Sequence, residues 1–321
     1  MQCSSYISSY IHNIISKSAK HRALYNHISP ILFDVSLRDG IQGATVASWP
    51  TQKKLETFDT IIQTFHPQSI EVGSICSYKR LPIMADTREI YNYATSAFSG
   101  DDNLPTHTTQ LAYVLVPSIS KLPTALKYGM TNLSFITSVS EQFQLKNTNM
   151  SLLDVKTEFS RLVHILNREP RPEQFVKKLY ISCINECPIA GKLDNDVVIN
   201  EILYYSRFPF DEFCLSDTCG TLQYDDFQYI VDTLVVFGVP LSAISIHLHV
   251  PATNRENLEH ILRFCFRKGI RRFDVSTIET GGCAVSMDQG RLLPNLSYDQ
   301  FYTILDKHIT SVVENNNLET I

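Results

Sequence analysis

Two histidines two positions apart, His247 and His249, lie at the end of the apolar run 243–248. Residues two apart in a β-strand project from the same face, so both imidazoles are expected to point the same way. A carboxylate, Asp39, follows another apolar run at residues 31–35. Two imidazoles and a carboxylate are ligands that suit an octahedral Mg²⁺, Mn²⁺ or Co²⁺ ion, and they also allow tetrahedral zinc.

Each motif has a plainer interpretation when it is taken alone. A histidine at a strand end is commonly a hydrogen-bonded core residue, and Arg38 beside Asp39 also fits an ordinary ion pair in a solvated turn. Together the motifs favour a metal site, because acidic and imidazole groups gather at the ends of separate apolar runs.

The elements that must position these groups alternate along the chain. Short apolar runs typical of buried strands are separated by segments of helical length. The predicted strands are 31–35, 69–73, 111–116, 131–136, 178–183, 212–215, 243–248 and 271–275. The predicted helices are 51–64, 81–97, 119–128, 151–167, 194–208, 222–237, 253–268 and 298–315.

This alternation predicts an α/β fold, a (β/α)8 TIM barrel in a single domain over residues 30–321. A doubly wound open sheet is the structural alternative, but such sheets usually carry a glycine-rich first turn. The chain has neither GxGxxG nor GxxxxGK[ST]. Residues 1–29 are predicted to form an N-terminal extension.

The extension bears on localisation. Residues 1–28 contain no Asp or Glu, which is typical of mitochondrial transit peptides, yet they contain few arginines. The alternative is an N-terminal helix or tail packed outside the main domain. We therefore expect a cytoplasmic protein, or a mitochondrial matrix protein if residues 1–28 act as a transit peptide.

The bulk composition excludes several classes of partner. A net charge of -5 without a basic block gives no electrostatic case for binding nucleic acid or an anionic membrane. No apolar run approaches the roughly 20 residues that a membrane span needs. The eight cysteines form no CxxC pair, so we expect free thiols rather than a zinc ribbon or a disulfide framework.

In a barrel, the carboxyl ends of the strands converge on one face. Glu71 is a further candidate for function there, because an unpaired carboxylate emerging from an apolar strand would be costly to bury. The polar residues expected on this face are Arg38, Asp39, Gln42, Glu71, Ser74, Ser182, Cys183, Asn185, Asp217, Thr218, His247, His249, Ser276, Thr277 and the turn 281–283.

The motifs carry a family resemblance. RDGxQ at 38–42 and HxH at 247–249 resemble the DRE-TIM metallolyases, a group of lyases, aldolases and Claisen-type synthases on a (β/α)8 barrel. Within that group, SCINECPIAGK at 182–192 and SEQFQLKNTN at 140–149 are similar to segments of the hydroxymethylglutaryl-CoA lyases. The likeness extends over roughly residues 30–300 and keeps the order of the motifs.

The resemblance implies a metal-dependent retro-Claisen cleavage of 3-hydroxy-3-methylglutaryl-CoA to acetyl-CoA and acetoacetate. The implied cofactor is Mg²⁺ or Mn²⁺, and the implied partner is the acyl-CoA substrate. A homodimer is compatible with the resemblance. The implied metal ligands are Asp39, His247, His249 and Asn295. Among the implied catalytic residues, Arg38 polarises the thioester carbonyl and Cys283 supplies a proton. The other implied catalytic residues are Glu71, Asp217 and His247. The implied substrate-binding residues are Gln42, Ser182 and Thr218.

Some positions depart from the family pattern and leave alternatives open. Val250 stands where the family usually has an Asp, and Asn295 lies 12 positions after Cys283, farther than the usual spacing. The loop at 279–286 reads ETGGCAVS rather than GLGGCPYA. Another DRE-TIM metallolyase acting on a different oxo or hydroxy acid is one alternative, and a non-catalytic barrel is the second. Lys79 and Lys146 are candidate contacts for the phosphates of CoA.

Overall fold

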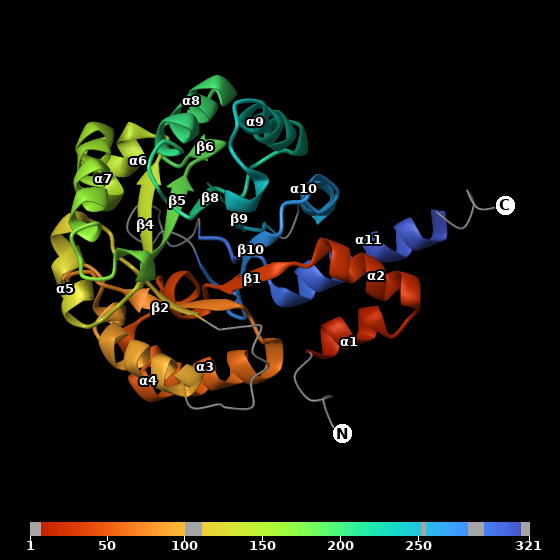
Figure 1. The fold of residues 1–321 in the computed structure, drawn as a ribbon, viewed down its shortest axis with the longest axis horizontal. Coiled ribbons are helices and arrows are strands. Elements are labelled where there is room, and N and C mark those ends of the chain that lie inside the picture. The colour runs from red at the N-terminus through yellow and green to blue at the C-terminus, as the bar shows by residue number, and fades with distance from the viewer. Residues whose placement is uncertain (1–7, 100–110, 252–254, 282–291, 316–321) are drawn as a thin grey trace.

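Eight parallel strands close into a barrel in the computed structural model of the chain, which describes residues 8–99, 111–251, 255–281 and 292–315 (Figure 1). The order around the barrel is β1-β10-β9-β8-β5-β4-β3-β2, and β1 closes it by pairing with β10. The predicted (β/α)8 barrel is thereby confirmed. The strands are β1 (Ile31–Asp34), β2 (Ser69–Ser74), β3 (Leu111–Leu115), β4 (Asn132–Ser138), β5 (Val176–Ser182), β8 (Glu212–Asp217), β9 (Ile244–Leu248) and β10 (Arg272–Val275).

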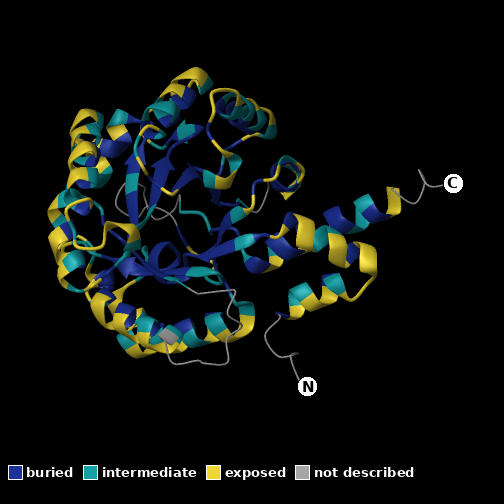
Figure 2. Ribbon diagram, viewed as in Figure 1, coloured by how far each residue is buried: buried dark blue, intermediate teal, exposed yellow. Residues whose placement is uncertain are grey.

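Helices surround the barrel and pack their apolar faces onto it. Figure 2 shows the strands buried and the outward faces of the helices exposed. The helices that follow the strands are α3 (Thr51–Phe65), α4 (Thr87–Ser99), α5 (Leu122–Lys127), α6 (Glu141–Thr148), α7 (Leu152–Leu166), α8 (Asn195–Tyr205), α9 (Tyr224–Val236), α10 (Arg255–Lys268) and α11 (Tyr298–Asn315). Within the described residues, no helix has the length and apolarity needed to cross a membrane.

Helix α6 and a hairpin of two short strands were not predicted. Helix α6 has eight residues and lacks an apolar stripe, so it gave no periodic signal. The strands β6 (Glu186–Cys187) and β7 (Gly191–Lys192) form a small antiparallel hairpin in the loop after β5. Both lie within the two segments that resemble the lyases.

Helices α1 (Ser9–Ile15) and α2 (Ala19–Ile28) lie beside α11 at one end of the molecule (Figure 1). The Tyr10 ring stacks on that of Tyr302 with the centroids 5.0 Å apart, and Lys17 pairs with Asp306 at 2.6 Å. The helical interpretation of the extension therefore fits its described part. The domain boundary at residue 29 and the role of residues 1–28 in targeting stay predictions.

The barrel interior holds a group of paired charged side chains. The ammonium group of Lys178 lies 2.5 Å from Asp274 and 2.9 Å from Glu212, and Glu212 also pairs with Arg272 at 3.1 Å. Burial lowers the pKa of a lysine, but Asp274 and Glu212 raise the pKa of Lys178 above its ordinary value. Lys178 therefore stays charged and holds Asp274 ionised in the middle of the barrel.

The packing of α11 on the barrel can be tested with two phenylalanines. Phe301 is fully buried against the rings of Phe266 and Phe273, whereas the Phe237 side chain is 67% exposed. Phe301→Ala is expected to lower the free energy of unfolding by about 3–5 kcal/mol. Phe237→Ala should change it by less than about 0.5 kcal/mol. Urea unfolding of both variants measures the difference, and equal losses would contradict this packing.

Candidate active site

The RDG segment forms a tight turn directly after β1. Residues Ser36–Gly40 make a single π-helical turn and all five are buried. Such turns occur frequently at functional sites. Gly40 packs closely on the loop after β10, since a Cβ atom there would lie 3.0 Å from Ser276 Oγ. The turn thus fixes Arg38 and Asp39 at the carboxyl end of the barrel.

Arg38 is held between two carboxylates. Its Nη1 donates to Asp39 Oδ1 at 2.6 Å, and its Nε donates to Glu71 Oε2 at 2.5 Å. Burial lowers the pKa of an arginine, but Glu71 and Asp39 raise the pKa of Arg38 well above its ordinary value. Tyr180 also donates its hydroxyl to Glu71 Oε2, at 3.0 Å. Among the described residues, Glu71 Oε1 has no hydrogen-bond partner.

The two histidines are held in matching tautomers. His249 Nδ1 lies 3.0 Å from the carbonyl oxygen of Leu293, and His247 Nδ1 lies 3.1 Å from Asp274 Oδ2. A carbonyl or carboxylate oxygen only accepts, so these partners assign the proton of each ring to Nδ1. With both rings neutral, each Nε2 atom therefore carries a lone pair. They face each other at 3.3 Å, and each lies 3.9 Å from Asp39 Oδ2.

This arrangement fits a cation. The ligand atoms of Asp39, His247 and His249 all lie within 4.8 Å of one another. Two opposed lone pairs beside a carboxylate repel each other unless a proton or a metal ion lies between them. Burial, and then the charge of His247, lower the pKa of His249 to about 4, so a proton on His249 does not fill this role at neutral pH. A divalent ion suits the three groups better.

Asn295 lies beside the same three groups. It pairs with His249 as an isolated antiparallel bridge, and its Nδ2 donates to Asp39 Oδ2 at 3.1 Å. Its Oδ1 is buried and has no partner among the described residues. A half-turn of the amide exchanges its oxygen and nitrogen with little change of shape, and would present the oxygen as a fourth ligand. The structure therefore brings Asn295 to the site in spite of its unusual spacing in the sequence.

A cavity of about 300 Å³ opens over this cluster at the carboxyl ends of the strands. Several predicted site residues line it together: Arg38, Asp39, Gln42, Ser74, Ser182, Thr218, His247 and His249. Apolar side chains of Leu115, Ile136 and Phe143 make up part of its wall. One cavity therefore joins the candidate metal ligands to the apolar and polar groups that a substrate could contact.

Two predicted catalytic residues, Glu71 and Asp217, are not among the residues that line this cavity. The Asp217 carboxylate accepts the N–H groups of Thr221 and Leu222 at 3.2 and 3.1 Å and so anchors the loop after β8. Burial raises the pKa of Asp217 to about 6. Cys283 lies outside the described residues. The catalytic role of each stays a prediction.

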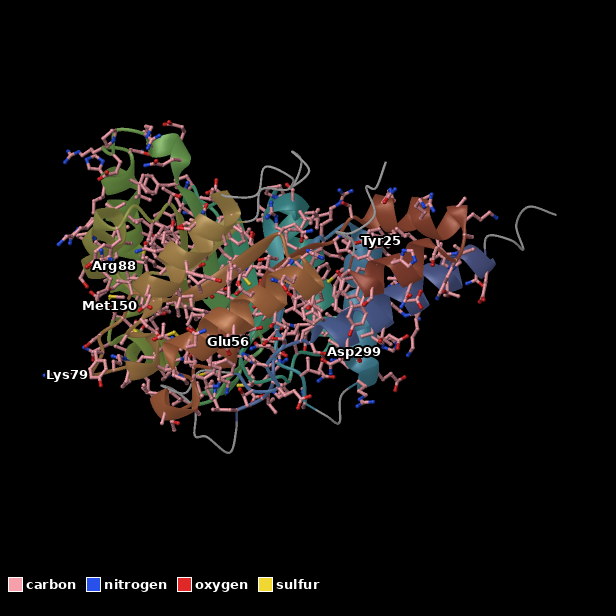
Figure 3. All side chains as sticks on the ribbon, turned by 90° about the horizontal axis from the view of Figure 1, so that it is seen from below. Tyr25, Glu56, Lys79, Arg88, Met150 and Asp299 are labelled. Atoms are coloured by element: carbon pink, nitrogen blue, oxygen red, sulfur yellow. The ribbon has the colours of Figure 1, made fainter. Side chains whose placement is uncertain are left out.

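The cationic groups of the cavity wall differ from those expected. Arg80 and Lys121 line the cavity, whereas Lys79 and Lys146 do not. Lys79 lies at the outer edge of the molecule (Figure 3). Arg80 donates to the carbonyl oxygens of Lys146 and Asn147 at 3.0 and 2.6 Å, which links the loop after β2 to helix α6.

Sequence reasoning missed the residues that support the histidines from inside the barrel. Asp274 accepts from His247, Lys178 holds Asp274, and the Tyr180 ring lies edge-on to His247 with the centroids 5.8 Å apart. A signal existed for the first two, since each is a charged residue within a predicted strand. Their partnership requires the closed barrel, which the sequence does not display.

Comparisons with known proteins agree with the resemblance. No family model matches the chain. It is 27% identical over 253 residues to the human cytoplasmic 3-hydroxy-3-methylglutaryl-CoA lyase, covering 78% of this chain and 63% of that protein. It thus spans less than two thirds of that relative's length. It is 27% identical over 251 residues to the chicken mitochondrial hydroxymethylglutaryl-CoA lyase, covering 78% of this chain and 77% of that one.

A bacterial relative and a solved structure extend the comparison. The chain is 28% identical over 257 residues to a 3-hydroxy-3-isohexenylglutaryl-CoA/hydroxy-methylglutaryl-CoA lyase of Pseudomonas aeruginosa, covering 78% of this chain and 77% of that one. It shares its fold with an HMG-CoA lyase of Acinetobacter baumannii solved with coenzyme A and 3-methylmalate. That match has a TM-score of 0.72 and 20% identity, and covers 88% of this chain and 84% of the other. The resemblance to this group of carbon–carbon lyases is confirmed.

Metal binding should be visible as a gain in thermal stability. A ligand that binds only the native state stabilises it, by about 2.7 kcal/mol at a free concentration 100 times its Kd. Excess Mn²⁺ should therefore raise the melting temperature of the wild-type protein, but not that of His249→Ala. His164→Ala is the matched control, because His164 is exposed on α7 and should leave the Mn²⁺ shift intact. Equal shifts in all three proteins would exclude this site.

Proposed function

We propose that this chain, a hydroxymethylglutaryl-CoA lyase-like carbon–carbon lyase, cleaves 3-hydroxy-3-methylglutaryl-CoA to acetyl-CoA and acetoacetate. One observation carries the proposal. The metal-binding cluster of Asp39, His247 and His249 and the paired cation Arg38 open onto the same cavity. The A. baumannii relative, solved with coenzyme A and 3-methylmalate, supports an acyl-CoA substrate.

The cofactor of the proposed reaction is Mg²⁺ or Mn²⁺. Asp39, His247, His249 and Asn295 would hold it through one carboxylate oxygen, two Nε2 atoms and one amide oxygen. When bound, the ion supplies Lewis acidity that lowers the pKa of the tertiary hydroxyl group of the substrate.

Arg38 is the residue that we assign to the thioester. Its guanidinium is buried and fixed by two carboxylates, so it needs no reorganisation to stabilise negative charge that develops on the carbonyl oxygen. Glu71 positions Arg38 through Oε2. Its Oε1, which lacks a partner in the described structure, is left to accept a proton.

The proposed cleavage requires neither an oxidant nor a reductant. The hydroxyl proton of C3 passes to a base, for which we propose Glu71, and the hydroxyl becomes the ketone of acetoacetate. The C2–C3 bond breaks, and its electron pair forms the enolate of the acetyl thioester. A proton returns to C2, and by resemblance to the family we propose Cys283 as its donor. We route no step through Asp217, because both of its carboxylate oxygens accept backbone N–H groups of the loop after β8.

The remaining lining residues are assigned to substrate binding. Gln42, Ser182 and Thr218 offer amide and hydroxyl groups to the substrate carboxylate and thioester. Arg80 and Lys121 are placed to meet the phosphates of CoA, because both are cations on the cavity wall.

The apolar wall favours a second substrate. Leu115, Ile136 and Phe143 form a surface that an alkyl group on C3 can bury against. The P. aeruginosa relative is named for an isohexenylglutaryl-CoA as well as for the methyl compound. A 3-hydroxyglutaryl-CoA with a longer C3 alkyl group is therefore the second candidate.

A coupled assay of acetoacetate release tests the reaction. Wild-type protein with Mg²⁺ or Mn²⁺ should turn over 3-hydroxy-3-methylglutaryl-CoA, and a chelator should abolish turnover. Cys283→Ala should lower kcat by about 10²- to 10⁴-fold, the typical contribution of a positioned proton donor. Cys265→Ala is the matched control, because this thiol lies in the core beneath α10, away from the cavity.

The outcomes separate the alternatives. Turnover of only the longer substrate would keep the reaction and change the acyl group. Absent turnover of both, with Mn²⁺ still bound, would indicate another metallolyase. If neither substrate is turned over and no metal binds, the proposal of a metal-dependent enzyme is contradicted.

A further inference from the structure

We propose that Asp274 is a positioning residue of the metal site, which fixes His247 in the tautomer that presents its Nε2 lone pair to Asp39 and His249. The inference rests on the metal site proposed above. It concerns a carboxylate that does not line the cavity and that contacts the ligand cluster only through His247.

Asp274 contacts both His247 and Lys178. Its Oδ2 lies 3.1 Å from His247 Nδ1, and its Oδ1 lies 2.5 Å from the ammonium group of Lys178. Asp274 is 1% exposed and stands on β10, which pairs in parallel with β9, the strand of His247. One carboxylate therefore accepts from a permanent cation on one side and from an imidazole on the other.

Lys178 determines which atom of a polar side chain at position 274 must face it. Glu212 forms an ion pair with Lys178 as well, and Arg272 balances Glu212, so two cations and two carboxylates lie in one layer. An ammonium group only donates, so whatever replaces Asp274 must present an acceptor toward Lys178. A carboxylate can accept on both sides at once, whereas an amide has one acceptor and one donor end.

An asparagine at this position would therefore change the tautomer of His247. Its oxygen would turn toward Lys178 and its amino group toward His247, because the opposite orientation sets two donors against each other. His247 Nδ1 would then have to accept, which moves the ring proton to Nε2 and removes the lone pair from the ligand cluster. His249 provides an internal reference, since a backbone carbonyl oxygen holds its Nδ1 and no substitution at 274 alters that partner.

The test measures the tautomer and the metal affinity separately. In metal-free protein labelled with ¹⁵N-histidine, long-range ¹H–¹⁵N spectra should show Nδ1-protonated His247 in the wild type and Nε2-protonated His247 in Asp274→Asn. His249 should keep its tautomer in both. Titration calorimetry should show Mn²⁺ binding weakened about 10- to 100-fold in Asp274→Asn, the usual effect of losing such a partner.

The matched control is Asp34→Asn. Asp34 is also a fully buried carboxylate of the barrel, but it accepts from Tyr298 and Ser36 rather than from a histidine. The substitution makes the same change of Asp to Asn on a neighbouring strand. It should leave the His247 tautomer and the Mn²⁺ affinity at their wild-type values.

The double variant Lys178→Met/Asp274→Asn gives the sharpest result. It removes one cation and one anion together, so the Glu212–Arg272 pair stays balanced. Without Lys178, the asparagine oxygen is free to turn toward His247 and accept from Nδ1. The double variant should therefore recover the Nδ1-protonated tautomer and bind Mn²⁺ more tightly than Asp274→Asn, which a merely structural defect would not do.

Two results would overturn the inference: an unchanged tautomer and affinity in Asp274→Asn, or Nε2-protonated His247 in the double variant. The second decides the matter even if the single variant does not fold. Wild-type protein that binds no Mn²⁺ would contradict the proposed function instead, and the tautomers would still test the role of Asp274.

Discussion

Charge pairing inside a closed barrel is the constraint on which the site depends. A cation buried among apolar strands is stable only beside carboxylates, and the barrel contains two such cations, Arg38 and Lys178. Arg38 is paired with Asp39 and Glu71, and Lys178 with Asp274 and Glu212. In each pairing, one carboxylate oxygen faces a histidine of the site: Asp39 Oδ2 faces the Nε2 atoms of His247 and His249, and Asp274 Oδ2 faces His247 Nδ1. The groups that neutralise the barrel interior are thus the same groups that orient its chemistry.

The two pairings meet at His247. Asp274 holds its Nδ1 from within the barrel, and Asp39 approaches its Nε2 from the mouth. The imidazole is therefore fixed between a carboxylate that gives it a tautomer and a carboxylate that shares its proposed ligand role. His249 reaches the same state through the carbonyl oxygen of Leu293, which belongs to the segment that brings Asn295 to the cluster.

The sequence predicted what depends on local pattern. Apolar runs such as 31–35 and 243–248 located the strands because buried parallel strands are continuous in their apolar residues. The strand-end position of Asp39, His247 and His249 then placed them on one face. The short helix α6 and the β6–β7 hairpin were missed because neither has a periodic apolar signal. Lys178 and Asp274 are 96 positions apart, so only the closed barrel reveals their contact.

The most direct test of this account is a crystal structure of the Mn²⁺-loaded protein with anomalous diffraction data collected near the manganese edge. The account predicts one strong anomalous peak among Asp39 Oδ2 and the Nε2 atoms of His247 and His249, with the Asn295 amide oxygen turned toward it. A cluster without such a peak, or a peak only at surface carboxylates, would contradict the metal site and the reaction proposed from it.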